Sequence, residues 1–206
     1  MSDRINKPYE FLDDENVIIA NNFNTHHDWT KTVFNQIKVN IITHLRNEQE
    51  NKCCYCKSEL GFDIKEMDIE HIIPKSEYES FTFHNKNLAL SCPACNTKKS
   101  TKSVLNKKCS CYPRSGNAFV IVHAHYDNYS TNIFIKDECV YVPRTSKGSD
   151  TIKYCELYRF LDVIEKARKF QIKKSPLAQL TEGLRNASES EVNEFIELIK
   201  DKLNNN

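Results

Sequence analysis

Two cysteine pairs with the same spacing constrain the fold of this chain more than any other feature. Cys53 and Cys56 form one C-x-x-C pair, and Cys92 and Cys95 form a second pair after the intervening segment 57–91. Two such pairs are typical of a closed tetrahedral zinc site, because each tight turn presents two thiolates to one ion. We therefore expect Zn²⁺ as a structural cofactor bound by these four cysteines.

The remaining cysteines do not form an evident second site. Cys54 lies inside the first pair, but only the outer two of these three thiols match the spacing of the second pair, so Cys54 is interpreted as a bystander. Cys109 and Cys111 stay unassigned. Cys139 and Cys155 are interpreted as small buried apolar residues. Because no regular cysteine framework is present, we expect metal ligands and free thiols rather than disulfides.

Composition indicates a folded protein of the cytoplasm. The chain has 206 residues, of which 39% are hydrophobic, enough for a core. No apolar run approaches the ~20 residues that a membrane span needs, and the first residues do not resemble a signal peptide. We therefore expect a cytoplasmic location.

The positive charge is concentrated around and after the second cysteine pair. The net charge is only +1, yet no Asp or Glu occurs from Ser80 to Tyr126. Seven basic residues lie in that stretch: Lys86, Lys98, Lys99, Lys102, Lys107, Lys108 and Arg114. This distribution suits binding to a phosphate backbone, although a solvated lysine-rich helix face explains it equally well.

Periodicity predicts an α+β fold in three parts: residues 1–50, 51–108 and 109–206. Helices are predicted over 28–50 (with Asp28 as N-cap), 94–105, 151–170 and 188–203. Strand patterns occupy 68–73 and 118–125, and 132–142 is predicted to hold a further strand or a hairpin. Residues 88–90 are a short apolar run, and 146–149 is predicted to be a turn or linker. In the last helix, Ser188 and Glu191 form a capping box. The apolar stripe along this helix suits either docking to a partner or packing against another helix of the same chain.

The segment between the cysteine pairs carries groups that a structural zinc does not need. Glu70 and His71 are neighbours at the end of a predicted strand, where the turning chain can bring both side chains to one site. A lone histidine here would usually be structural or exposed. However, Asn87 and Asn96 follow it, and Asn96 lies directly behind Cys95.

This ordered set resembles the HNH endonuclease family, the ββα-metal nucleases, and particularly its members with two C-x-x-C pairs. The resemblance covers about residues 50–105. It rests on Cys53, Cys56, the run from Glu70 to Ser76, Asn87, Leu88, Cys92, Cys95, Asn96 and Lys99. It implies a zinc-stabilised ββα core, with a helical N-terminal segment and a mixed α/β C-terminal extension, that hydrolyses DNA phosphodiester bonds.

The resemblance also implies roles for single residues. His71 would be the general base, Asn87 would hold the loop that orients it, and Glu70 with Asn96 would bind a catalytic Mg²⁺ or Mn²⁺. Many relatives have Asp at the position of Glu70 and His at that of Asn96, so metal preference is open. His84 is interpreted as a surface residue, with a second ligand as the alternative. Nucleic-acid contacts are expected from Lys98, Lys99 and Lys102.

Short motifs in the C-terminal half are similar to the PtuB-like HNH subunits of Septu and retron-associated anti-phage systems. These motifs are 121–123, 127–129, 147–152 and 157–159. This resemblance implies an antiviral nuclease that works beside an ABC/SMC-like, PtuA-like ATPase, a separate chain because no P-loop occurs here. The alternatives are a zinc-stabilised nucleic-acid-binding module with an inactive or regulatory HNH site, and a purely structural zinc protein.

Overall fold

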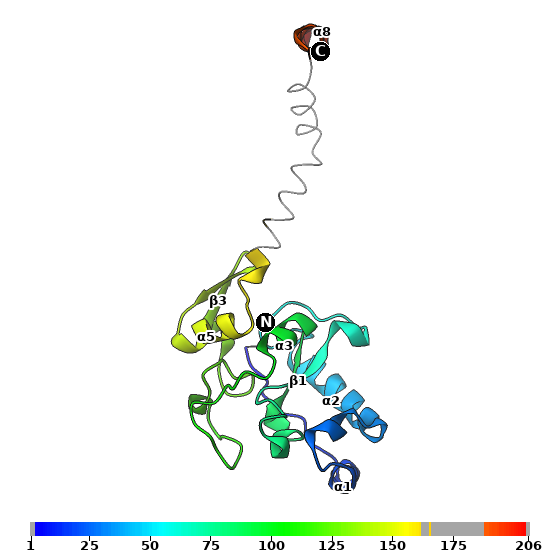
Figure 1. Cartoon of the computed structure of the whole chain (residues 1–206), viewed down its shortest axis with the longest axis vertical. Helices are drawn as coiled ribbons and strands as arrows, with labels where there is room; N and C mark the ends of the chain where they lie inside the picture. The colour runs from blue at the N-terminus through cyan, green and yellow to red at the C-terminus, as the bar shows by residue number, and fades with distance from the viewer. Residues whose placement is uncertain (1–2, 162–164, 166–187, 205–206) are drawn as a thin grey trace. The chain divides into compact units, whose positions relative to one another are not determined.

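The computed structural model describes residues 3–161, 165 and 188–204, which belong to two compact units. The first unit is Met1–Arg159 and the second is Phe160–Asn206 (Figure 1). The limits predicted near residues 50 and 108 both fall within the first unit. Across the described residues, every helix is too short or too polar to cross a membrane.

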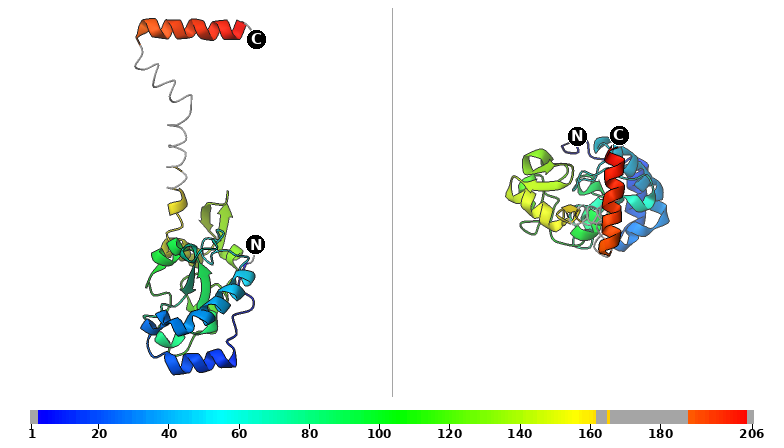
Figure 2. Two further views of the ribbon diagram at one scale, coloured as in Figure 1. Left: turned by 90° about the vertical axis from the view of Figure 1, so that its right-hand side faces the viewer. Right: turned by 90° about the horizontal axis from the view of Figure 1, so that it is seen from above.

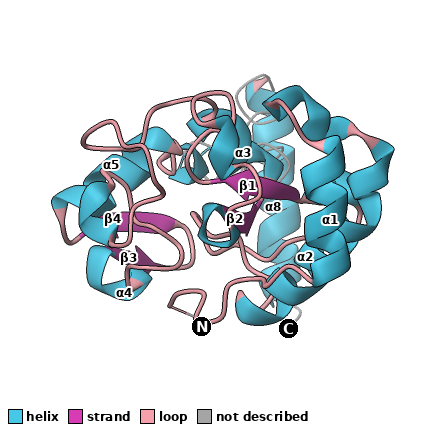
Figure 3. Ribbon diagram, turned by 90° about the horizontal axis from the view of Figure 1, so that it is seen from below, coloured by secondary structure: helices cyan, strands magenta, loops and turns pink. Residues whose placement is uncertain are grey.

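A small ββα core begins between the two cysteine pairs and ends just after the second pair. Strand β1 (Asp68–His71) pairs antiparallel with β2 (Leu88–Ser91), with His71 opposite Leu88 (Figure 3). Helix α3 (Pro93–Lys99) follows β2 directly, and its first residue is the proline, whose missing N–H has no partner to lose there. Every residue of β2 is buried, as expected for an apolar strand covered on both faces. The predicted α+β class is confirmed.

Helix α3 is shorter than the predicted helix over 94–105. Lys99 is its last residue, and Ser100 has a φ of 50°, a left-handed conformation that stops an α-helix. The strand predicted over 68–73 also ends early, at His71. The ends of β1 and α3 matter for the candidate site described below. The chain turns at each of these ends, and both turns border one pocket.

Two helices precede the core. Helix α1 is Asp13–Asn22, and α2 is Asn35–Glu48, which buries the predicted stripe of Ile37, Ile41 and Leu45. Just after α2, the Gln49 side chain donates to the Leu90 carbonyl at 2.9 Å and accepts from the Leu90 N–H at 2.7 Å. The side chain of Gln49 thereby joins α2 to β2.

The predicted N-cap at Asp28 is wrong. Two 3₁₀ helices, His26–Thr30 and Thr32–Phe34, precede α2. The Asp28 carboxylate accepts hydrogen bonds from the backbone of Asn24 and Thr25, and so stabilises the first of these instead. Local competition of a short acidic side chain for nearby N–H groups explains the difference.

The rest of the first unit contains α4 (Tyr129–Asn132), β3 (Ile133–Lys136), β4 (Val140–Pro143) and α5 (Ser146–Tyr154). Strands β3 and β4 form the predicted hairpin. The predicted turn at 146–149 is instead the first turn of α5, capped by the Thr145 hydroxyl, which accepts from the Gly148 N–H.

No strand forms over residues 118–125 of the described structure, contrary to prediction. Phe119, Ile121 and Val122 are buried, but the backbone makes only an isolated bridge between Phe119 and Leu105 and otherwise bonds to scattered partners. For example, the N–H of Val120 bonds to the Val104 carbonyl, and that of Val122 bonds to the Thr151 hydroxyl.

Helix α8 (Glu189–Asn204) lies in the second unit (Figure 2). The predicted capping box at its start is confirmed. Ser188 N–H donates to the Glu191 carboxylate at 2.8 Å, and the Glu191 N–H donates back to the Ser188 hydroxyl. The helix predicted over 151–170 is interrupted, because α5 ends at Tyr154 and residues 155–158 form a turn before helix resumes at 159–161. Most of the rest of that range lies outside the described residues.

Candidate functional site

The four paired cysteines form a single cluster. Their sulfur atoms all lie within 4.8 Å of one another, and the Sγ atoms of Cys56 and Cys92 are 3.8 Å apart. A tetrahedron with Zn–S bonds of about 2.3 Å has edges of about 3.8 Å, so the donor set fits Zn²⁺. Among the described residues, these cysteines are the only group of three or more His, Cys, Asp or Glu placed to hold a metal. Cys54 is buried beside them but is not a member.

Residues beyond 108 brace this cysteine cluster. The Tyr141 hydroxyl donates to the Cys56 carbonyl at 2.7 Å, and the Arg159 guanidinium donates to the Cys95 sulfur at 3.1 Å. A guanidinium against a thiolate offsets part of the negative charge that four cysteine ligands bring. The C-terminal part of the first unit is therefore built into the zinc site.

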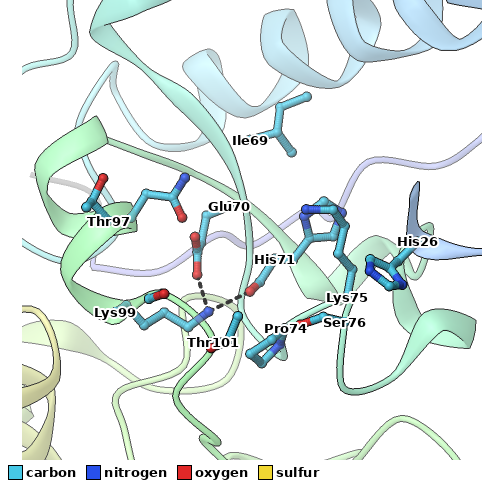
Figure 4. Close-up of a pocket in the computed structure, with 12 residues that line it drawn as sticks. His26, Ile69, Glu70, His71, Pro74, Lys75, Ser76, Thr97, Lys99 and Thr101 are labelled. Carbon is cyan, nitrogen blue, oxygen red and sulfur yellow. Dashed lines mark hydrogen bonds and ion pairs between the residues drawn. The ribbon is translucent and has the colours of Figure 1, made fainter. Parts of the chain in front are cut away.

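One pocket of about 400 Å³ lies between the end of β1 and the last residues of α3 (Figure 4). It is lined by Glu70, His71 and Asn96, three of the four residues predicted to form the catalytic site. The other lining residues are His26, Ile69, Pro74, Lys75, Ser76, Thr97, Lys99, Ser100 and Thr101. The fourth predicted residue, Asn87, lies outside the lining.

His71 is held as a neutral imidazole. Its side chain is buried, a ring N–H bonds to the backbone carbonyl of Thr82, and Nε2 has no hydrogen-bond partner. Burial, assisted by the charges of Lys75 and Lys99, lowers the pKa of His71 to about 3. The Trp29 ring packs edge to face on the imidazole, with centroids 4.6 Å apart. A fixed ring whose Nε2 lone pair has no protein partner meets the requirement for a group that accepts a proton.

Glu70 is tied into a buried network. Its Oε1 accepts from the Tyr55 hydroxyl at 3.0 Å and lies 2.5 Å from the Lys99 ammonium. Lys99 also donates to the His71 carbonyl at 2.7 Å, so one ammonium holds the backbone and a side chain at the end of β1. Burial raises the pKa of the Glu70 carboxyl, and the Lys99 charge opposes this rise.

Lys99 was expected to contact nucleic acid from a surface helix, but it is only 1% exposed. Its ammonium is directed inward because α3 packs that face against β1. Lys98 and Lys102 lie outside the pocket: Lys98 pairs with Glu156 at 2.7 Å, and Lys102 donates to the Tyr154 carbonyl. Their nucleic-acid contacts stay a prediction.

Removing the buried ammonium should destabilise the protein strongly. Lys99→Met leaves the Glu70 carboxylate buried without its charge partner, and we expect a loss of about 3–5 kcal/mol in the free energy of unfolding. Lys98→Met is the matched control, because the Lys98–Glu156 pair is substantially exposed and contributes no more than about 1 kcal/mol. Urea unfolding of the zinc-loaded proteins measures both. Equal losses in the two variants would contradict the structural role of Lys99.

Asn96 and Asp68 add oxygen atoms beside Glu70. The Asn96 amide N–H donates to the Asp68 carboxylate at 2.9 Å, which leaves the amide oxygen for another partner. Sequence analysis missed Asp68, although it lies two positions before Glu70 on β1 and therefore on the same strand face. Oxygen donors of this kind are the ligands that Mg²⁺ and Mn²⁺ prefer.

Asn87 spans the loop that follows His71. Its side chain exchanges two hydrogen bonds with the backbone of Ile73 and donates to the carbonyl of Phe81. It is fully buried, so its contacts are with the protein alone. His84, the alternative metal ligand, is also outside the pocket and stacks on Tyr112, with ring centroids 3.9 Å apart.

Buried histidines connect the C-terminal part of the first unit to β2. The Tyr112 hydroxyl lies 2.9 Å from Nε2 of His123 and also bonds to Asn87. His125 Nε2 lies 2.8 Å from the Leu88 carbonyl, opposite His71 in the sheet, while its Nδ1 has no partner. This network braces the strand behind the pocket.

Acid should destabilise the fold through His125. Burial lowers its pKa to about 4, below the ordinary value near 6.5, so below pH 6.5 the unfolded chain binds a proton that the native chain does not. Stability is complete above pH 6.5 and falls as the pH drops toward 4, by about 1.4 kcal/mol at pH 5.5 from this residue. His125→Gln removes this dependence. Denaturant unfolding at pH 7.5 and 5.5, with zinc retention checked, should show a stability gap between wild type and variant that narrows in acid. A constant gap would refute this.

Comparisons with known proteins agree with this geometry. Residues 53–102 match the family model described as HNH endonuclease. A segment of 51 residues is 43% identical to Septu protein PtuB of Bacillus thuringiensis. That segment is 25% of this chain and 20% of the relative, so the chain matches about a fifth of the relative's length. Residues 53–102 thus match the HNH endonuclease family model, which confirms the resemblance seen in the motif.

Proposed function

We propose that this protein is a metal-dependent endonuclease that hydrolyses DNA phosphodiester bonds as the nuclease of a prokaryotic anti-phage defence system. The observation that carries the proposal is the buried, unpartnered Nε2 of His71, within a domain that matches HNH endonucleases and in the same pocket as Glu70 and Asn96. A structural zinc domain has no need of a neutral histidine held in this way.

In the proposed reaction, His71 Nε2 takes a proton from water. The resulting hydroxide oxygen forms a new bond to phosphorus as the bond to the leaving sugar oxygen breaks. The Thr82 carbonyl keeps the proton on the other ring nitrogen, so that Nε2 is the basic atom. Asn87 acts as a positioning residue, because it fixes the backbone on both sides of the turn after His71.

Glu70 and Asn96 would hold the catalytic divalent metal. When bound, Mg²⁺ or Mn²⁺ would stabilise the charge that develops on the phosphate and the leaving oxygen. Glu70 Oε1 is already engaged by Lys99 and Tyr55, so Oε2 is the oxygen that we assign to the metal. Asp68 would then orient Asn96 through the bond to its amide.

We further propose that an ABC/SMC-like ATPase, a PtuA-like chain, works with this nuclease. The support is the similarity to Septu protein PtuB. ATP binding and hydrolysis would belong to that ATPase.

A second candidate is a nucleic-acid-binding module with an inactive or regulatory HNH site. The observation that favours it is the Lys99–Glu70 ion pair, which occupies one oxygen of the carboxylate assigned to the metal. Both candidates predict zinc and DNA binding, but only the first predicts cleavage.

Plasmid nicking distinguishes these candidates. The zinc-loaded protein, alone and with an ATPase that co-purifies with it, is incubated with supercoiled DNA and Mg²⁺ or Mn²⁺. We expect cleavage that EDTA abolishes. DNA binding without cleavage under every metal and with the ATPase present would favour the binding module.

A further inference from the structure

A second histidine lines the pocket, and it comes from outside the HNH domain. His26 begins the 3₁₀ helix His26–Thr30 and forms part of the pocket wall together with His71 and Lys75 (Figure 4). The same short helix supplies Trp29, whose ring packs on His71. This segment therefore both encloses His71 and brings another imidazole to the pocket.

Glu79 fixes the His26 ring. Nδ1 of His26 lies 2.6 Å from the Glu79 Oε1, and the His26 backbone N–H donates to the same oxygen at 3.1 Å. These two bonds lower the pKa of the Glu79 carboxyl, so it is ionised and can only accept. The proton of the shorter bond is therefore on Nδ1 of His26, and Nε2 is the ring nitrogen that remains for a ligand.

Two cations near the site are already engaged inside the protein. Lys99 is buried against Glu70, and the Lys98 ammonium lies 2.7 Å from Glu156. His26 also has a charge partner, Glu79, but only at Nδ1, and it keeps 25% of its side chain exposed at the pocket that the DNA would have to enter. A phosphate in this pocket needs donors, and an oriented imidazole N–H supplies one.

We propose that His26 binds a DNA phosphate, donating from Nε2 to a non-bridging oxygen while Nδ1 donates to Glu79. The inference rests on the proposed function, since it assumes that this pocket receives DNA. An imidazole that donates from both nitrogens carries a positive charge. His26 therefore contributes a charge-assisted hydrogen bond and neutralises one phosphate, and Glu79 is the positioning residue behind it.

DNA binding by the full chain tests this assignment. The variants are made in a His71→Ala background, and the affinity for a short labelled duplex is measured by fluorescence anisotropy with Mg²⁺ at several salt concentrations. We expect His26→Ala to weaken binding about 10- to 100-fold. The slope of log affinity against log salt should fall by about one unit, because one fewer counterion is released.

Two further variants make the result specific. His26→Gln keeps a donor without the charge, so it should bind better than His26→Ala but show the same reduced salt slope. His27→Ala is the matched control, because His27 is the exposed neighbour on the same helix and does not line the pocket. Its ring packs on that of His26, with centroids 4.0 Å apart, so this variant reports any loss of support for the His26 ring. It should leave the salt slope unchanged and the affinity close to that of the unsubstituted chain. Zinc content and melting temperature verify that each variant is folded.

Either of two results overturns the proposal: an unchanged affinity in His26→Ala, or a weaker affinity with an unchanged salt slope, which would mean that His26 only supports the 3₁₀ helix. A wild-type chain that binds no duplex overturns it as well. Failure of the proposed nuclease function would give a different set of results. In that case wild type never nicks DNA, while the affinity and salt slope still depend on His26.

Discussion

His71→Ala should reduce DNA cleavage about 10²- to 10⁴-fold, the usual contribution of a general base. The variant removes the unpartnered Nε2 that would take the proton from water. It does not touch the cysteine cluster, and the ion pair between Glu70 and Lys99 does not involve the imidazole. We therefore expect normal zinc content and normal DNA affinity, with the loss confined to the turnover rate in a plasmid-nicking assay.

The control for this variant is His84→Ala. His84 is a partly buried histidine that stacks on Tyr112 and lies outside the pocket, so its loss should leave the cleavage rate within about twofold of wild type. If His71→Ala still cleaves at the wild-type rate, the assignment of the general base is wrong. Cleavage lost equally in both variants would point to a general loss of structure.

Removing the zinc should unfold the HNH core, and DNA cleavage should be lost with the fold. Structural zinc contributes apparent binding free energies of about 10–16 kcal/mol, which is as large as the whole stability of a typical domain. Cys95→Ser removes one of the four ligands, and Cys95 directly precedes the pocket residue Asn96 on helix α3. We expect this variant, or wild type treated with a strong chelator, to lose zinc by elemental analysis and to lose helical and strand signal by circular dichroism.

The remaining cysteines provide the control for zinc loss. Cys111 is exposed and outside the cluster, so Cys111→Ser should keep one zinc ion per chain and full activity. Cys54→Ala should also keep the zinc, although Cys54 is buried and its loss will lower the melting temperature slightly. A Cys95→Ser protein that stays folded without zinc would show that the surrounding residues, including Tyr141 and Arg159, are sufficient to hold the core.

Most local features of this chain could be predicted from the sequence. The spacing of the cysteines predicted their cluster. The hairpin of β3 and β4 and the capping box at Ser188 were likewise predicted correctly. Each of these signals depends on residues that are close together along the chain, where turn geometry and backbone hydrogen bonding dominate.

The choice among competing backbone partners could not be predicted. Asp28 resembled an N-cap, yet it bonds to Asn24 and Thr25 ahead of it, and residues 118–125 resembled a strand that has no partner strand. In neither case was the intrinsic propensity of the residues for capping or for strand formation misjudged. The sequence pattern records which residues are apolar or able to cap a helix, but not which competing partner is nearby.

The candidate site likewise combines features that the sequence predicted with features that it did not. The order of Glu70, His71 and Asn96 between and beside the cysteine pairs was enough to identify an HNH domain, because a short zinc-bound ββα unit allows those residues few other arrangements. Tertiary structure alone decided that Lys99 turns inward to Glu70 and that His26 enters the pocket. Burial and charge pairing are settled by packing between segments far apart in the sequence, and spacing along the chain does not encode them.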